Sequence, residues 1–418
     1  MNRKMLLLEK RKITFIDFLI LIYISASYVF SLVEKYVIVF RSIAVLLIVS
    51  LLYYVLKKRN HKIRIDSFIM FAIAFFLFGF FSIIWAKNSS YTIVKIITIA
   101  EILLLIILLY DYVYYEKKRD FLIFSTATAG TVYSIYILAF YGLGNYLLLL
   151  QNSERIGSEI ANVNTIGVIL AFSCIIHLWY ILYQKKYIMI IPFALNLIVS
   201  VGTGSRKVIL CLVVGIFLFV ILKAQTRKQM IIGFIEVIIV SFILYYASQL
   251  SLFASVNGRF GRFYAALSGQ GRADGSSLAR LEYIRIGFIE FFKRPLWGVG
   301  LGNSKWITSQ YIGKETYLHC NYVELLSTLG IIGFILYYAM YFIPIKKYIK
   351  YGIKGNPYHI LGLVMIVLRL IMHIAAVTYY DKFEYMNLLM AMVLISPIVI
   401  DKEENSDLAD KSINTKNR

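Results

Sequence analysis

Arg206 stands at the end of a segment that could bind a phosphate group. The segment Gly-Thr-Gly-Ser-Arg reads as a tight turn that leads into a helix. A helix N-terminus with an arginine suits a phosphate, and Ser205 adds a hydroxyl donor. The alternative is a flanking arginine whose head group reaches the lipid surface. Because the pair Arg206 and Lys207 falls where the topology below leaves few positive charges, the phosphate site is favoured.

Two further arginines have the same chemistry but less decisive surroundings. Arg280 begins a stretch with helical spacing, in Ser-Leu-Ala-Arg, and Arg155 lies in the loop 143–160. Each suits an anionic substrate, and each also suits an arginine that contacts lipid head groups. Spacing alone leaves both interpretations open.

His319 is the histidine with the most informative surroundings, in Tyr-Leu-His-Cys-Asn-Tyr-Val-Glu. An imidazole has an unperturbed pKa of about 6.5, which suits a general base near neutral pH. A lone histidine is more often a packed residue, but here Asn321 and Glu324 can support it from the next helical turn. We therefore expect His319 to act as the base, with Asn321 and Glu324 near the substrate.

Arg369 and His373 lie four residues apart in an apolar stretch, hence on one face of a helix. Ionisable residues at membrane depth are functional candidates by default. Equally, they may be expected to line the bundle interior as partners of Glu101, Glu236 or Asp17. The sequence contains no zinc-like Cys/His spacing, nucleotide-binding glycine loop or nucleophile elbow. We therefore expect no metal and no cofactor.

The elements that position these residues are transmembrane helices. Of the 418 residues, 60% are hydrophobic and 16% are charged, and the mean hydropathy is +0.74. Soluble domains carry about 25% charged residues, so the chain is an all-α polytopic membrane protein. The net charge of +21 comes from small clusters between apolar runs, which is typical of residues that orient helices against lipid. A nucleic-acid partner is not expected.

About twelve apolar runs approach the roughly 20 residues that a span requires. They fall near 13–31, 36–56, 66–86, 92–112, 120–142, 161–183, 187–203, 206–223, 229–249, 321–343, 357–379 and 384–400.

Basic residues cluster in alternate connections between these runs, which sets the expected orientation. The clusters occupy 3–12, 57–64, 117–119, 185–186, 223–228 and 346–354. The intervening short connections carry few positive charges. Both termini are therefore expected in the cytoplasm, with a multi-pass domain over residues 1–400 in the cell membrane and a polar cytoplasmic tail at 401–418.

Residues 250–320 form a loop of about 70 residues that this topology places outside the cytoplasm. Long loops in compact proteins usually carry function. Its first half is rich in glycine and is expected to be mobile, whereas apolar residues recur at helical spacing over 277–292. We expect an amphipathic helix at the membrane surface there.

Four stretches of the chain resemble the O-antigen ligase and polymerase superfamily, which comprises Wzy-type and ligase-type membrane glycosyltransferases. Three are short: Phe-Ser-Ile-Ile-Trp-Ala at 81–86, Asn-Val-Asn-Thr-Ile-Gly at 162–167 and Thr-Gly-Ser-Arg at 203–206. The most specific is an ordered block that runs from Arg280 through 295–303 (Pro-Leu-Trp-Gly-Val-Gly-Leu-Gly-Asn) and 319–322 to 329–333.

The resemblance implies a metal-independent GT-C-like transferase that uses a polyprenyl-pyrophosphate-linked oligosaccharide as donor. The essential arginines of the family fall on Arg206 and Arg280, and its essential histidine on His319. We expect the two arginines to bind the pyrophosphate and His319 to deprotonate an acceptor sugar hydroxyl, with inversion at the anomeric carbon. Arg155 remains a further candidate, although Gly167 comes one residue late for the arginine-to-glycine spacing of some polymerases.

Three activities fit this chain: a capsule-type polymerase, an O-antigen ligase of the same fold, and a flippase for lipid-linked glycans. The polymerase is favoured by the segment Gly-Ile-Ile-Gly-Phe-Ile-Leu-Tyr-Tyr at 330–338. A flippase usually shows internal repeats and broken helices at matched positions, and none is evident. Expected partners are the lipid-linked donor and acceptor, the bilayer, and proteins of polysaccharide export or chain-length control.

Overall fold

The computed structural model describes residues 13–152, 154–224, 226–248 and 275–395, and within them the chain forms helices and no strand. The helices are α1 (Phe15–Val29), α2 (Val37–Lys57), α3 (Ser67–Phe81), α4 (Ser89–Tyr115), α5 (Arg119–Tyr141), α6 (Leu143–Gln151), α7 (Val163–Gln184), α8 (Ile190–Gly202), α9 (Arg206–Lys223), α10 (Arg227–Ser248), α12 (Gly275–Lys293), α13 (Ser304–Ile312), α14 (Asn321–Tyr351), α15 (Pro357–Met372) and α16 (Lys382–Val393). The all-α prediction is confirmed for these residues.

Several helices begin where a short polar side chain can cap the free backbone N–H groups. Asp66, Asn88, Asn162, Asn356 and Asp381 each precede a helix and accept hydrogen bonds from its first N–H groups. Such caps satisfy donors that the helix itself leaves unpaired. The helix starts are therefore set by local sequence, although the bodies of the helices are almost uniformly apolar.

Each of the twelve predicted spans overlaps one of these helices, but the number of spans is confirmed only in part. Among the described residues, six helices are long and apolar enough to cross a membrane: Val37–Lys57, Ser67–Ile84, Ser89–Tyr115, Arg119–Tyr141, Val163–Gln184 and Asn321–Tyr351. Phe15–Val29, Tyr187–Gly202 and Pro357–Met372 are apolar but shorter. The chain is thus a membrane protein with several apolar helices.

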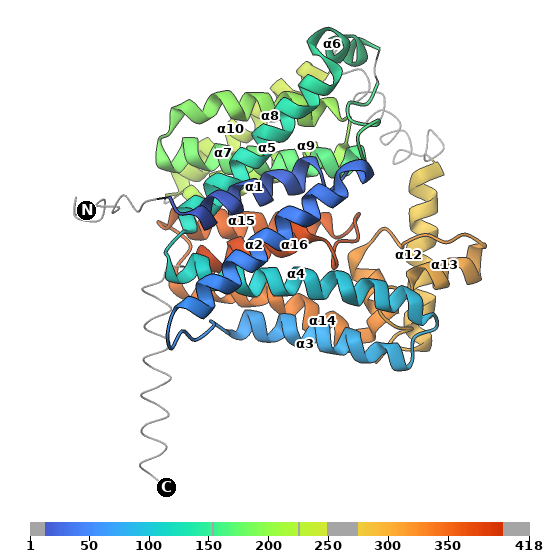
Figure 1. Cartoon of the computed structure of the whole chain (residues 1–418). Coiled ribbons are helices and arrows are strands. Elements are labelled where there is room, and N and C mark those ends of the chain that lie inside the picture. Colours follow the sequence, from blue (N-terminus) through green and yellow to red (C-terminus); the bar gives the residue numbers. More distant parts are fainter. Residues whose placement is uncertain (1–12, 153, 225, 249–274, 396–418) are drawn as a thin grey trace.

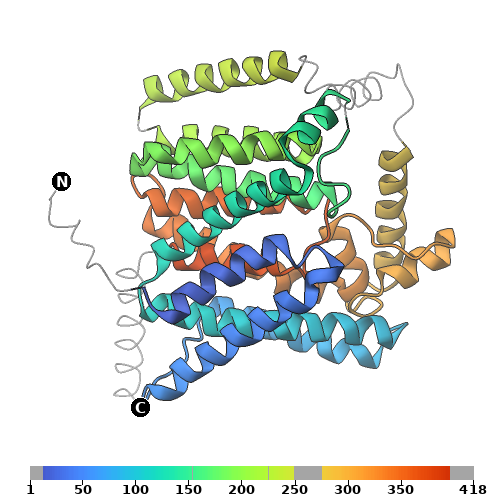
Figure 2. The same cartoon turned by 45° about the horizontal axis from the view of Figure 1, so that its top comes forward.

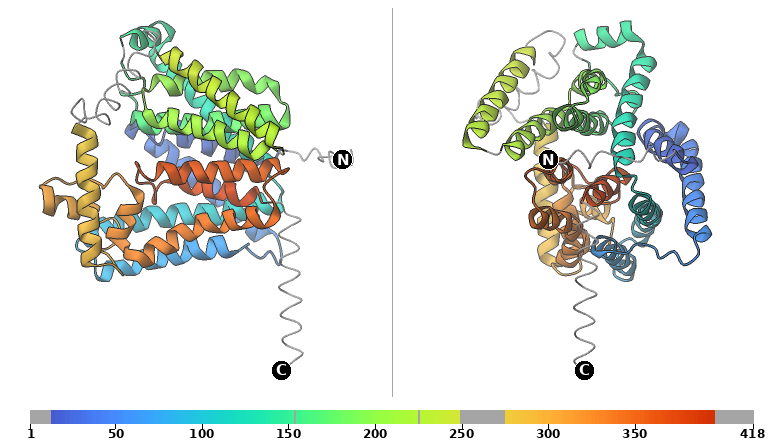
Figure 3. Two further views of the ribbon diagram at one scale, coloured as in Figure 1. Left: turned by 180° about the vertical axis from the view of Figure 1, so that it is seen from behind. Right: turned by 90° about the vertical axis from the view of Figure 1, so that its left-hand side faces the viewer.

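The helices run side by side in one bundle, and α12 lies across one end of it (Figure 1, Figure 3). The short helices α6 and α13 lie at this same end, which we call the α12 end. The basic connections α4–α5, α7–α8, α9–α10 and α14–α15 lie at the opposite end (Figure 1). In Figure 2, α10 lies at the edge of the bundle, outside α9.

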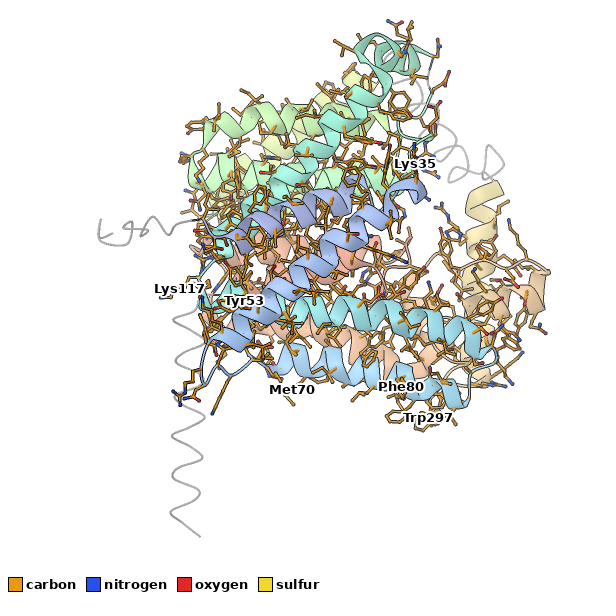
Figure 4. The ribbon with its side chains drawn as sticks, viewed as in Figure 1. Lys35, Tyr53, Met70, Phe80, Lys117 and Trp297 are labelled. Atoms are coloured by element: carbon orange, nitrogen blue, oxygen red, sulfur yellow. The ribbon has the colours of Figure 1, made fainter. Side chains whose placement is uncertain are left out.

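Side chains mark the two ends of the bundle (Figure 4). Lys35, Phe80 and Trp297 lie toward the α12 end, whereas Tyr53 and Lys117 lie toward the opposite end. Trp297 is half-exposed and stacks on Phe78 with ring centroids 5.9 Å apart. Exposed aromatic rings at one end of an apolar bundle are typical of a membrane–water interface.

The predicted span 357–379 is wrong in its last seven residues, 373–379. The helix α15 ends at Met372, and the chain then turns until α16 begins at Lys382. The turn is held from α14, because Asn321 Oδ1 accepts hydrogen bonds from the backbone N–H groups of Thr378 (2.9 Å) and Tyr379 (3.1 Å). Residues 374–377 are apolar, so hydropathy gave no sign of this turn.

The predicted amphipathic helix at 277–292 is confirmed as a helix, α12 (Gly275–Lys293). The glycine-rich segment before residue 275 and the tail 401–418 lie outside the described residues.

Candidate active site

His319 lies in the connection between α13 and α14, with its backbone in the left-handed region (φ 60°). That conformation costs a non-glycine residue about 1–2 kcal/mol, and it persists only where neighbours fix it. The imidazole contacts two tyrosine rings: its centroid is 4.0 Å from that of Tyr317 and 5.5 Å from that of Tyr283 on α12, nearly parallel to the latter. These two contacts help to position the ring.

Glu324, in the first turn of α14, holds the backbone that carries His319. Its buried carboxylate accepts a hydrogen bond from the Leu318 backbone N–H (2.9 Å) and another from the Ser304 hydroxyl (2.8 Å). Both oxygens are therefore used inside the protein. Glu324 thus holds the backbone next to the histidine; a role of Glu324 in the reaction stays a prediction.

A cavity of about 800 Å³ opens beside His319. Its lining comes from α1, α2, α4, α7, α9, α12, α15 and α16 and from the connections that contain residues 317–319 and 375–381. Arg280, Lys207 and His319 line it together, from three elements that are far apart in the sequence. Apolar side chains of α2 and α4, such as Ile48 and Leu105, line another part.

The charges of this site act on the imidazole. Burial, and then the positive charges of Arg280 and Lys207, lower the pKa of His319 to about 4. The ring is therefore neutral at pH 7 and has a nitrogen lone pair free to accept a proton. Burial also raises the pKa of the neighbouring Tyr317 phenol.

Of the predicted basic pair, Lys207 lines the cavity, whereas Arg206 is not among the described lining residues. Arg206 and Lys207 are neighbours in the first turn of α9, so their side chains leave the helix in different directions. The Lys207 ammonium donates a hydrogen bond to the carbonyl of Ala375 in the turn before α16. The sequence pattern located this helix N-terminus, but only the three-dimensional arrangement selects Lys207 as a cavity residue.

Ser205 and Arg155 share one hydrogen-bond acceptor at the start of α7. Asn164 Oδ1 accepts from the Ser205 hydroxyl (3.0 Å) and from Arg155 Nη2 (3.1 Å), and Arg155 Nε donates to the carbonyl of Thr203 (2.9 Å). The stretches 162–167 and 203–206 are thus tied together. The structure brings Ser205 and Arg155 together beside the cavity but not among its described lining residues.

Asn321 is completely buried at the start of α14. Besides holding the turn before α16, its amide donates to the Tyr338 hydroxyl (3.1 Å), and its backbone N–H donates to the carbonyl of His373 (2.8 Å). Both groups of the Asn321 side-chain amide are therefore used in hydrogen bonds inside the protein. They join the start of α14 to the turn before α16.

Arg369 and His373 share a carboxylate that the sequence analysis did not single out, Glu384 on α16. Arg369 Nη1 lies 3.5 Å from Glu384 Oε2, and His373 Nε2 lies 3.2 Å from Glu384 Oε1. Asp17, one of the expected partners, instead pairs with Lys118 (2.6 Å). Glu384 lies at the start of the predicted span 384–400, which was the available signal, because an acid in an apolar span requires a partner.

The glycine-rich block 295–303 packs against a break in α14. Gly330 has left-handed backbone (φ 65°), so the helix loses its regular pairing there. Val299 and Gly300 donate their backbone N–H groups to the freed carbonyls of Ser327 (3.2 Å) and Thr328 (2.8 Å), and Ile331 donates to Pro295 (2.8 Å). The loop therefore completes the hydrogen bonds that the kink leaves open.

The same loop is also joined to the start of α4. Asn303 Oδ1 accepts from the Asn88 backbone N–H (2.7 Å), and the Thr92 hydroxyl donates to the carbonyl of Leu301 (2.9 Å). Hydrogen bonds thus join the start of α4, the loop 295–303 and the part of α14 around Gly330. These bonds fix the helix that follows His319.

Among the described residues, no group of three or more His, Cys, Asp or Glu side chains is arranged to hold a metal ion. A metal-independent reaction remains a prediction.

Residues 191–338, from α8 into α14, match a family model described as O-antigen ligase. The predicted resemblance is confirmed over this stretch. O-antigen ligase family members are glycosyltransferase-like enzymes, so the match supports ligase- or polymerase-type activity. The matched stretch contains Lys207, Arg280, Tyr317 and His319, all of which line the cavity. No curated protein matches the chain at a significant level of similarity.

The O-antigen ligase match does not extend over the whole cavity. Arg41 on α2, Glu101 on α4 and Arg369 on α15 lie outside the matched residues, yet all line the same space. The site is therefore composite: one wall comes from the family-matched part of the chain and the others come from helices before and after it.

Proposed function

We propose that this protein is an integral-membrane glycosyltransferase that polymerises lipid-linked glycan repeat units at the outer face of the membrane. The observation that carries the proposal is one cavity that combines a neutral histidine, two cations and apolar helix surfaces. A pyrophosphate-linked lipid needs positive charge at its head and apolar contact along its chain. The family match supports the same reaction class.

Arg280 and Lys207 bind the donor pyrophosphate in this proposal. Cationic side chains close to phosphate oxygens form short, charge-assisted hydrogen bonds, and arginine matches them with a planar fork. The prenyl chain lies against the apolar surfaces of α2 and α4. Arg206, at the N-terminus of the same helix as Lys207, adds positive potential there.

His319 is the general base. It takes the proton from the acceptor sugar hydroxyl as that oxygen attacks the anomeric carbon of the donor glycan. The bond between the anomeric carbon and the phosphate oxygen breaks, and the lipid pyrophosphate leaves with the electron pair. Direct displacement inverts the configuration at that carbon.

The cations then stabilise the negative charge that grows on the leaving group. Removing one preorganised donor of this kind raises a barrier by about 3–4 kcal/mol. We propose that Glu324, Asn321, Ser205 and Arg155 position the reacting groups through the hydrogen bonds described above.

A ligase that transfers finished glycan to a different acceptor is the second candidate. The observation that favours it is the description of the matched family as O-antigen ligase. Both reactions use the same base and the same leaving group, so only the acceptor distinguishes them.

The test combines purified protein in detergent with the lipid-linked repeat unit of its host and separates the products by length. A ladder of products that disappears in the His319→Ala variant supports the polymerase. His359→Ala is the matched control, because His359 lies in the first turn of α15 and hydrogen bonds to the carbonyl of Gly352.

Other outcomes separate the alternatives. Transfer of one glycan to a non-identical acceptor would identify a ligase. Donor binding without any transfer in the folded protein would contradict both enzymatic functions and favour transport.

A further inference from the structure

Arg369 is a buried arginine at the same cavity. It lies in the last turn of α15, is 6% exposed, and lines the cavity. Its guanidinium carbon lies 4.1 Å from the ring centroid of Phe172 on α7, which supports one face of the group. A buried charge in an apolar bundle has an unfavourable solvation free energy, so such a residue is a functional candidate.

The carboxylate beside Arg369 only partly satisfies it. The nearest oxygen of Glu384 is 3.5 Å from Nη1, and Arg369 Nε has no hydrogen-bond partner among the described residues. Glu384 is approached from its other side by His373 (3.2 Å) and accepts a hydrogen bond from the Tyr341 hydroxyl. Glu384 therefore balances the charge of Arg369 and leaves the buried Nε of the guanidinium without an acceptor among the described residues.

The charge around the cavity favours an anionic occupant. Among the described residues, five cationic side chains line it against two acidic ones: Arg41, Lys207, Arg280, Arg369 and Lys382 against Glu101 and Asp381. Two phosphate groups in series would offset this excess. A buried donor left without an acceptor is unfavourable, so a phosphate oxygen that supplied the missing acceptor would remove this penalty.

We propose that Arg369 is a third cationic group that binds the pyrophosphate of the lipid-linked substrate, and that Glu384 and His373 hold its guanidinium in place. This inference rests on the proposed function and assigns a further residue to the same site. It separates two roles inside one cluster: Arg369 contacts substrate, whereas Glu384 and His373 position it.

A purely structural ion pair makes a different prediction, which a double substitution exposes. Arg369→Gln leaves Glu384 as a buried, poorly compensated carboxylate, so the variant loses stability in either case. Combining it with Glu384→Gln removes both charges. If the pair is only structural, the double variant recovers stability and substrate binding together. If Arg369 binds phosphate, stability recovers and binding does not.

The probe is undecaprenyl pyrophosphate in detergent, with undecaprenol, which lacks both phosphates, as the matched lipid control. Binding is measured by calorimetry and stability by the melting temperature, with the full-length protein. We expect Arg369→Gln and the double variant to bind the pyrophosphate roughly 10- to 100-fold more weakly than the wild type, with no change in undecaprenol binding. The melting temperature of the double variant returns toward the wild-type value.

A second ion pair controls for the general effect of losing buried charges. Lys118, directly before α5, forms such a pair with Asp17 on α1, and neither residue is among the described residues that line the cavity. Lys118→Gln should lower the melting temperature without changing affinity for the pyrophosphate.

Wild-type affinity for undecaprenyl pyrophosphate in the double variant would overturn the assignment of Arg369 and leave the proposed function intact. Equal binding of the pyrophosphate and the alcohol by the wild type would contradict the donor class itself. The two failures are therefore distinguishable.

Discussion

His319 lies close to positive charges whose effect on its pKa a bound pyrophosphate would change. In the free protein, burial together with Arg280 and Lys207 lowers its pKa to about 4. A bound pyrophosphate adds negative charge beside these cations, which offsets their effect on the imidazole and raises its pKa. In the proposed reaction, the weak base of the free protein would become a stronger base in the complex with the pyrophosphate.

The pH dependence of the reaction should show this change. The free protein keeps a neutral imidazole down to about pH 4, so the acid limb of kcat/KM attributable to His319 lies near that value. The acid limb of kcat, which reports the bound state, lies at higher pH. Steady-state rates between pH 4 and 8 check the order, and coincident limbs would contradict it.

The stability of the protein should follow the same group. Because the folded state lowers the pKa of His319 below the ordinary value, the unfolded chain binds the extra proton more readily. The free energy of unfolding therefore has its full value above about pH 6.5 and decreases progressively as the pH falls toward 4. The melting temperature of wild type should therefore decline more over this range than that of His319→Gln, and parallel curves would argue against the shift.

Glu324 controls the position of the histidine without contacting substrate. Glu324→Gln keeps the shape but replaces one acceptor of the Leu318 and Ser304 hydrogen bonds by a donor. Misplacing a reacting group by about 1 Å can cost roughly 100-fold in rate. We expect kcat to fall by about that factor with little change in KM. Glu116→Gln, which affects contacts with Lys58 and Tyr54 at the opposite end, should retain activity.

At the scale of elements, the break in α14 requires a glycine at position 330. A Cβ at Gly330 would come within 2.2 Å of the carbonyl oxygen of Leu296, and the backbone there is left-handed. Gly330→Ala therefore combines strain of about 1–2 kcal/mol with a backbone overlap. We expect a lower melting temperature in detergent and loss of activity.

Gly352 separates the two causes of that loss. It is also left-handed (φ 84°), but nothing lies within 4 Å of its added Cβ. Gly352→Ala should show the strain alone and keep activity. Equal destabilisation by the two alanines would show that the contact with Leu296 is unimportant.

The sequence predicted elements better than it predicted their junctions. Caps and apolar runs place most helix starts within a few residues, because both signals are local. The turn after Met372 was missed because its residues are as apolar as the helix they end, and its support comes from Asn321 on another helix. The short helices α6 and α13 were not predicted either, since each is only nine residues long.

The candidate site divides in the same way. His319 was singled out from residue type and local context, and Arg280 from the family resemblance. The choice between Arg206 and Lys207 depends on which face of α9 meets the cavity, and the pairing of Arg369 with Glu384 depends on two helices meeting. Contacts of that kind have no signature in a single sequence.

At the scale of the whole molecule, the bundle has two chemically distinct ends. Lys35 lies toward the α12 end and Lys117 toward the opposite, basic end. If the basic end is cytoplasmic, as the distribution of charge predicts, the cavity beside His319 opens outward. Both termini then lie in the cytoplasm.

A membrane-impermeant maleimide can test this orientation in intact cells. The cysteines Cys174, Cys211 and Cys320 are buried, so the background labelling should be low. Lys35→Cys should react from outside, and Lys117→Cys should react only after the membrane is opened. The reverse pattern would invert the topology and remove the outer-face reaction.

The composite cavity has a consequence for how such a protein can diversify. The proposed base His319 and the proposed pyrophosphate ligands Lys207 and Arg280 lie within residues 191–338, whereas Arg369 and much of the remaining lining come from α1, α2, α4, α15 and the α15–α16 turn. Exchanging those outer segments between relatives should therefore alter which glycan is accepted while the bond-breaking step stays the same. Chemistry and selectivity would then be inherited as separable parts of one chain.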